Sequence, residues 1–479
     1  MVSVADPFRR VEAFDELAFF REEFHDCLTA RADELFELVE AVLCAPGAVR
    51  SLVDLALSPE HRRGHGALYD GINAGRIAVG RLSKVVAGMP VPRAADGRIV
   101  LAVDVSNWLR PDAPTSPERL FCHVYGRGKG NAQMIPGRPY SVVAALESGR
   151  TSWTAVLDAV RPGPADDVAE VTATRLRRVV ERLIEFGHWR TGDRRITICP
   201  DAGYDIPRPA FMLADLPVEV LGRLRSDRVS CFPAVNVHSP RGGRPAVHGP
   251  VFALNDDATQ PEPRIVTVTE TTRYGTAKAV SWDRLHPRPT HRTCWLDHDG
   301  ALPVIEGTII RLEVDHLPGD RDPKPVWLWS SIIEATPADV DRWWQSYLRR
   351  FDLEHMFRMW KQTLGWTAPK IRSPEAADRW TWLIIAAHTQ LRLARHLVDD
   401  LRHPWEKPAA PGRPTPARVR RGFRNIRPML PLPAGAPKPT TPGPGRPPGS
   451  RNRRPATIHD VGKTVKRDLT ITEHEAHRG

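Results

Sequence analysis

The chain has 479 residues, of which 41% are hydrophobic. A chain of this length can hold about two to four domains and bury at least one large core. Its net charge of +11 favours a polyanionic partner. No apolar run reaches the roughly 18 residues that span a bilayer, and the N-terminus MVSVADPFRRVEAFDEL lacks an apolar signal core. We therefore expect a cytoplasmic protein with no membrane partner.

Cysteine use agrees with that compartment. The six cysteines lie far apart and form no CxxC pair, so we expect reduced thiols and no disulfide framework.

Residues 1–97 are predicted to be helical. Apolar residues recur at helical spacing in FDELAFFREEFHDCLTARADELFELVEAVL, and a proline break at MPVPRAADG ends the region.

Residues 98–216 are predicted to begin an α/β domain. A β-branched apolar run, RIVLAVD, ends at Asp104, and HVYGRGKGNAQMIPGRPYSVVAAL supplies two further strands around a glycine-rich turn. An amphipathic helix over 167–189 then leads into a second apolar strand, RITICPD, which ends at Asp201. This order is typical of a mixed α/β sheet.

The remaining sequence divides into three parts. Strand-like pieces alternate with Pro, Gly and Asp turns over 217–330, which predicts a β-rich insertion, and helices return over 331–404. Residues 405–479 form a basic, Pro-rich tail that we expect to be mostly disordered: 14 of the 46 prolines lie within 401–450, and 401–456 hold 13 Lys or Arg against one acid.

One predicted helix carries an unusual polar stripe. SYLRRFDLEHMFRMWKQTL has no Pro or Gly between Ser346 and Leu364, and most of its surface is apolar. Tyr347, Arg350, Glu354 and Lys361 nevertheless fall within roughly 60° of one another around a helix with about 100° per residue. By itself, such a stripe is more typical of a solvated face with helical ion pairs.

The two acids at strand ends give the stripe a second interpretation. Residues just past the strand ends of an α/β sheet face a common crevice, and Asp104 and Asp201 would repel each other there unless a cation lay between them. Carboxylate oxygens suit hard divalent ions such as Mg²⁺, and Glu354 is the natural third ligand. Asp205 is the alternative to Asp201, which we prefer because it directly follows the apolar strand.

The spacing Y-(2)-R-(3)-E-(6)-K at Tyr347, Arg350, Glu354 and Lys361 resembles the signature of DDE-type bacterial insertion-sequence transposases. The resemblance covers roughly residues 98–400. It implies an RNase H-like core with two strand-end aspartates, a β-rich insertion and then a helix that bears the Glu. ICPDAGYDIP is similar to the family's second-Asp segment, whereas DVSNW after the first Asp departs from the usual small residue and Thr.

What the resemblance implies is metal-dependent phosphodiester chemistry. Asp104, Asp201 and Glu354 would hold two Mg²⁺ ions, with Mn²⁺ as the alternative, to activate water or a DNA 3′-hydroxyl and to stabilise the leaving oxygen. Tyr347, Arg350 and Lys361 would contact DNA phosphate.

The function predicted on this basis is cut-and-paste DNA transposition by a cytoplasmic, nucleoid-associated protein. Residues 1–97 would be a helical DNA-binding region, and a homodimer would bring two transposon ends and target DNA together. A host DNA nuclease on the same fold and a catalytically silent DNA-binding protein are the alternatives.

Four further motifs have weaker signals. GRGKGN (126–131) is more typical of a glycine hairpin turn than of a phosphate loop, although Arg127 or Lys129 could contact DNA. HRTCWLDH lacks the second Cys of a zinc site. Trp282 or Trp295 could stack on a flipped base. Arg446, in PGRPP, resembles the minor-groove arginine of an AT-hook, and a Pro-rich linker explains it equally well. The zinc candidates in HRTCWLDH are His291, Cys294 and His298, and the core of the AT-hook-like motif is Gly445–Pro447.

Overall fold

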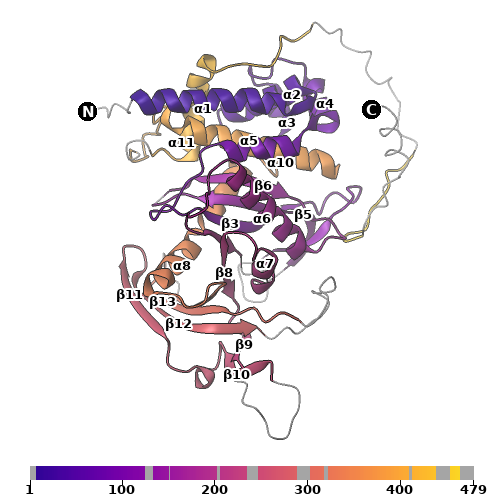
Figure 1. The fold of residues 1–479 in the computed structure, drawn as a ribbon. Coiled ribbons are helices and arrows are strands. Elements are labelled where there is room, and N and C mark those ends of the chain that lie inside the picture. The colour runs from indigo at the N-terminus through magenta and orange to yellow at the C-terminus, as the bar shows by residue number, and fades with distance from the viewer. Residues whose placement is uncertain are drawn as a thin grey trace, which may run out of the picture.

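The computed structural model describes residues 7–124, 133–149, 151–201, 205–234, 246–287, 302–317, 322–408, 413–438 and 454–463. These residues form an α/β molecule in which a helical layer covers one end of a long mixed sheet (Figure 1). None of the described helices is long and apolar enough to cross a membrane.

The centre of the molecule is a mixed sheet in the spatial order β6-β5-β3-β7-β8. Its central strand, β3, runs antiparallel to β5 and parallel to β7, and β7 runs parallel to β8. A short strand, β4, pairs with the first half of β5. The bounds are β3 (Val100–Leu109), β4 (Leu120–Val124), β5 (Gln133–Leu146), β6 (Thr154–Val160), β7 (Ile196–Pro200) and β8 (Val218–Leu224).

This arrangement confirms the predicted RNase H-like core. The strands β3 and β7 read as continuous apolar runs because they are covered on both faces, and every residue of β7 is buried. The predicted helix over 167–189 is α6 (Val168–Glu185), which begins where the Asp167 side chain accepts hydrogen bonds from the Ala169 and Glu170 amides.

The β-rich insertion continues the core sheet. Strand β8 pairs with β7 on one side and antiparallel with β14 on the other, so the sheet passes continuously across the predicted boundary at 217. From β14 the sheet runs on through β13, β12, β9 and β10, with β11 also paired to β12 (Figure 1). The bounds are β9 (Val229–Pro233), β10 (His248–Ala253), β11 (Ile265–Thr271), β12 (Gly275–Pro287), β13 (Gly307–Val314) and β14 (Val326–Ser330).

The helical N-terminal region packs on helices from the other end of the chain. Helix α10 contacts α1, α2 and α4, and α11 contacts α2. Arg21 joins three of these helices in the buried interior, because its guanidinium donates to Glu40 Oε1 at 2.6 Å and to Gln390 Oε1 at 2.8 Å. The elements are α1 (Pro7–Asp26), β1 (Leu28–Ala30), α2 (Ala32–Cys44), α3 (Leu52–Ala56), α4 (His65–Ala74), β2 (Arg76–Ile77), α5 (Val79–Gly88), α10 (Pro374–Leu393) and α11 (Pro416–Ile426). The short helices elsewhere are α7 (Pro207–Met212), η1 (Asp257–Thr259), η3 (Ala394–His396) and η4 (Arg427–Met429).

Helix α11 lies within the predicted tail and was not foreseen from the sequence. Its buried residues Val419, Phe423 and Ile426 recur at helical spacing, and Arg420 Nε donates to the Val42 carbonyl oxygen at 2.9 Å. Proline and arginine content hid this short apolar stripe.

A chain that ends at Trp405 should therefore be much less stable than the full chain. It loses α11, whose three buried apolar side chains contribute about 1.5–3 kcal/mol each, so we expect a loss of roughly 5 kcal/mol in the free energy of unfolding. Urea unfolding measures it, with a chain that ends at Lys438 as the control. Equal stability of the two truncated chains would contradict the structural role of α11.

Candidate active site

Two of the predicted acids lie side by side at the centre of the sheet. Strands β3 and β7 are parallel neighbours in which Val103 pairs with Pro200, so the next residues along, Asp104 and Asp201, stand at the same level. The Asp201 amide also donates to the Val103 carbonyl oxygen at 3.1 Å. Asp201 directly follows β7, as predicted. Asp104 lies inside β3 and not at its end, because that strand continues to Leu109.

Arg350 bridges the two acids. Its Nη1 lies 2.8 Å from Asp104 Oδ2, and its Nη2 lies 2.9 Å from Asp201 Oδ1. The Asp104 side chain is 8% exposed and the Asp201 side chain is 39% exposed. The sequence predicted that Arg350 contacts DNA phosphate, but in this structure its guanidinium is held by the two acids.

The polar stripe comes from two helices and not from one. Helix α8 (Pro337–Arg349) begins at a capping box formed by Thr336 and Asp339, and α9 spans Asp352–Gln362. Between them the amides of Arg350 and Phe351 donate to carbonyls three residues earlier, which makes a tight turn in place of the single predicted helix. No residue in the sequence signals this break, since neither Pro nor Gly lies there.

The side chains of the polar stripe are still grouped near Asp104 and Asp201. Glu354 is exposed on α9, and its charge lies close enough to raise the pKa of Asp104. Burial lowers the pKa of Lys361, while the charges of Glu354 and Asp104 oppose that shift. The Lys361 ammonium lies 5.9 Å from the centre of the Trp366 ring. Tyr347 is buried, with its ring centre 5.7 Å from the Arg350 guanidinium carbon.

The electrostatics of Asp104 indicate a site that is short of positive charge. Burial raises the pKa of this carboxyl to about 6, and the negative charges of Asp201 and Glu354 add to that shift. The Arg350 cation works in the opposite direction and does not cancel it. A carboxyl that ionises with difficulty beside two further acids is the setting in which an added cation is most favourable.

Comparison with known proteins now identifies the family. A model of the DDE superfamily endonucleases matches residues 23–288, more than half of the chain. The chain belongs to the DDE superfamily of endonucleases. A search of curated proteins gave no match. The matched residues include Asp104 and Asp201 and end before α9, which carries Glu354.

DDE endonucleases act on DNA and generally use divalent metals such as Mg²⁺. The residues at this site fit such an ion, because their ligand atoms are carboxylate oxygens. One of these carboxyl groups, that of Asp104, is buried and has a raised pKa. Among the described residues, no three His, Cys, Asp or Glu side chains already converge on one point. Arg350 lies between the two closest acids.

The two candidates for the second acid, Asp201 and Asp205, lie in different surroundings. Asp201 contacts Arg350, whereas Asp205 is exposed and its carbonyl accepts the Arg208 amide at the start of α7.

Of the remaining predicted motif residues, the structure describes Trp282. Trp282 is a core residue of the insertion: it is 5% exposed, packs on Phe252 and Trp327, and donates from Nε1 to the Pro261 carbonyl oxygen at 2.7 Å. It therefore has no free face for a base. Residues outside the described ranges are Arg127, Lys129, His291, Cys294, Trp295, His298 and Arg446.

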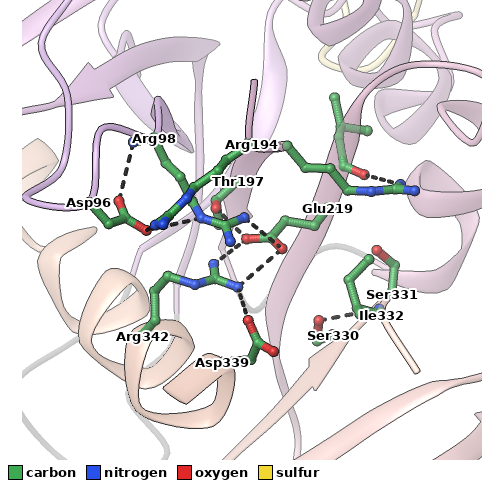
Figure 2. Close-up of polar contacts among 12 residues, drawn as sticks. Asp96, Arg98, Arg194, Thr197, Glu219, Ser330, Ser331, Ile332, Asp339 and Arg342 are labelled. Atoms are coloured by element: carbon green, nitrogen blue, oxygen red, sulfur yellow. Dashed lines mark hydrogen bonds and ion pairs between the residues drawn. The ribbon is translucent and has the colours of Figure 1, made fainter. Parts of the chain in front are cut away.

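A buried ion cluster that the sequence analysis missed fixes α8 against the sheet (Figure 2). Glu219 on β8 accepts hydrogen bonds from Thr197 on β7 and from Arg342 on α8. Arg342 also donates to Asp339 at 2.8 Å, and Arg98 Nη1 lies 3.6 Å from Glu219 Oε2. An acid inside the apolar strand VEVLGRL was the available signal. The cluster positions the helix that leads directly to Arg350.

The raised pKa of Asp104 predicts that this carboxyl lowers the stability of the fold when it is ionised. The folded protein holds a proton on Asp104 that the unfolded chain releases at lower pH, so this group stabilises the fold least once it is ionised, above about pH 6. Without divalent metal, the stability of Asp104→Asn relative to wild type should therefore rise by about 2 kcal/mol between pH 4 and pH 7. Urea unfolding in EDTA at several pH values measures the change, and a stability difference that does not vary with pH would contradict the raised pKa of Asp104.

Proposed function

We propose that this endonuclease is a DNA transposase, which binds the ends of its element, cuts them by hydrolysis and joins the freed ends to target DNA. The observation that carries the proposal is the pairing of Asp104 and Asp201 with one guanidinium, together with the charge of Glu354 on α9, which acts to raise the pKa of Asp104. The basic charge of the chain agrees with a DNA substrate.

Within this proposal, the three acids would hold two Mg²⁺ ions, with Mn²⁺ as the alternative. Bound there, the metal supplies an activated water or DNA 3′-hydroxyl and stabilises the leaving oxygen. The chain's own part would be to hold the three carboxylates in place. Lys361, on whose pKa the charges of Glu354 and Asp104 act, would contact the phosphate near the scissile bond, and Tyr347 would contact DNA phosphate through its hydroxyl.

The rest of the chain would bring DNA to this site. We propose that the helical region at 1–97 reads the transposon ends and that the basic tail, including Arg446, adds salt-sensitive affinity. A homodimer would hold two ends together, and the protein would act on the nucleoid in the cytoplasm.

Two rival functions share the same fold. A host nuclease would cut DNA without joining it, and a silent binding protein would do neither. The presence of all three acids, with Glu354 exposed, favours an active enzyme over the silent protein.

A DNA-joining assay distinguishes the transposase, the host nuclease and the silent DNA-binding protein. Purified protein is mixed with Mg²⁺, a supercoiled plasmid and a labelled duplex from the DNA that borders this gene. Transposase activity places the label in the plasmid through the 3′-hydroxyl. Cutting without joining would indicate the host nuclease, and binding without cutting would indicate the silent protein.

A further inference from the structure

The Arg350 guanidinium lies between Asp104 and Asp201 and contacts both. Its two terminal nitrogens reach one carboxylate each, at 2.8 Å and 2.9 Å. The side chain is only 15% exposed, and its Nε is buried without a hydrogen-bond partner in the described part of the chain. The guanidinium therefore gains its stabilisation from the two acids and from the neighbouring Tyr347 ring.

The contact occupies one oxygen of each acid. Asp104 Oδ1 accepts the Val105 amide at 2.7 Å, and Asp104 Oδ2 lies 2.8 Å from Arg350 Nη1. Asp201 Oδ1 lies 2.9 Å from Arg350 Nη2. A divalent ion that takes these two oxygens would displace the guanidinium from them.

We propose that Arg350 is a built-in competitor for the metal: it holds Asp104 and Asp201 together in the metal-free protein and leaves them when a divalent cation binds. This inference rests on the proposed metal site. In this proposal the Arg350 guanidinium has two roles: it holds the two acids before the metal binds, and it faces DNA afterwards. Once displaced, it is a planar, two-pronged donor beside the reacting DNA strand, which is suited to a phosphate.

The local backbone is consistent with such an exchange. Arg350 lies in the turn between α8 and α9, where hydrogen bonds to residues three positions earlier replace the regular helical ladder. A break of this kind within a helical segment often marks a hinge.

A role in positioning the acids for the metal would predict the opposite effect on metal affinity. If Arg350 only positioned the acids for the metal, its loss would weaken metal binding. If it competes with the metal, its loss strengthens metal binding, because the cation no longer has to displace a guanidinium.

Isothermal titration of Mg²⁺ into the metal-free full chain distinguishes these roles. We expect Arg350→Gln to bind Mg²⁺ at least about tenfold more tightly than wild type. The matched control is Arg349→Gln, which removes the neighbouring arginine, whose partner at 3.0 Å is Asp352. It should leave Mg²⁺ affinity unchanged. Equal or weaker binding by folded Arg350→Gln would overturn the proposal.

A second variant covers the case in which Arg350→Gln does not fold. Arg350→Lys keeps the charge but has only one nitrogen, so it should compete less well and bind Mg²⁺ more tightly than wild type. Equal or weaker binding by this variant would also overturn the proposal.

Asp104→Asn distinguishes a failure of the proposed metal site from a failure of the competitor role. If wild type binds no Mg²⁺, or binds as Asp104→Asn does, the proposed metal site itself fails. If Asp104→Asn abolishes binding but the Arg350 variants bind no more tightly, only the competitor role fails.

Discussion

Replacing Glu354 with Gln should lower the rate of DNA cleavage by about 10³-fold or more while leaving DNA binding nearly intact. The change keeps the size of the side chain and removes the charge that completes the carboxylate set. Because Glu354 is exposed on α9 and lies outside the core, the fold should not be disturbed. Cleavage of a labelled duplex from the DNA that borders the gene, with binding followed separately by fluorescence anisotropy, gives both values.

A neighbouring acid on the same helix provides the matched control. Asp352 accepts from Arg349 Nη2 at 3.0 Å and does not contact Asp104 or Asp201 in the described structure. Asp352→Asn should therefore retain cleavage within a few-fold. Equal losses from both changes would mean that α9 needs its acids for folding and that Glu354 is not the third ligand.

Glu219→Ala should cause the largest loss of stability among single changes near the site, about 3 kcal/mol or more. It removes the buried partner of Arg342 and Thr197 and leaves the Arg342 charge, which is 17% exposed, with Asp339 alone (Figure 2). Breaking one side of a buried ion pair costs about 3–5 kcal/mol, because the remaining charge has lost its compensation. Urea unfolding measures the loss.

The control for this change is an exposed pair. Lys84 and Glu185 lie 2.8 Å apart with both side chains about half exposed, so Glu185→Ala should cost less than about 1 kcal/mol. Since α8 leads into Arg350, the Glu219 variant should also lose cleavage activity at temperatures where it remains folded. A stable variant with full activity would show that the cluster does not position α8.

The sequence predicted the order of the elements well, for identifiable physical reasons. Continuous apolar runs predicted β3 and β7, and the acids that follow Val103 and Pro200 in those runs lie together because parallel neighbours bring equivalent positions to one level. The amphipathic pattern predicted α6.

What the sequence did not predict depends on tertiary contacts. The break between α8 and α9 has no Pro or Gly signal, and the partners of Arg350 come from strands more than 140 residues earlier. Helix α11 was hidden by the composition around it, because its stability comes from packing on α2 and not from propensity. The same holds for Glu219, whose partner Arg342 lies 123 residues away.

The most direct test of the central claim is excision, in cells, of a marker flanked by the DNA that borders this gene. We expect wild type to excise the marker and Glu354→Gln to fail, although both proteins accumulate and bind the same DNA. Equal excision by the two proteins would contradict the role of Glu354. Absence of excision by wild type, with DNA binding intact, would contradict transposition itself.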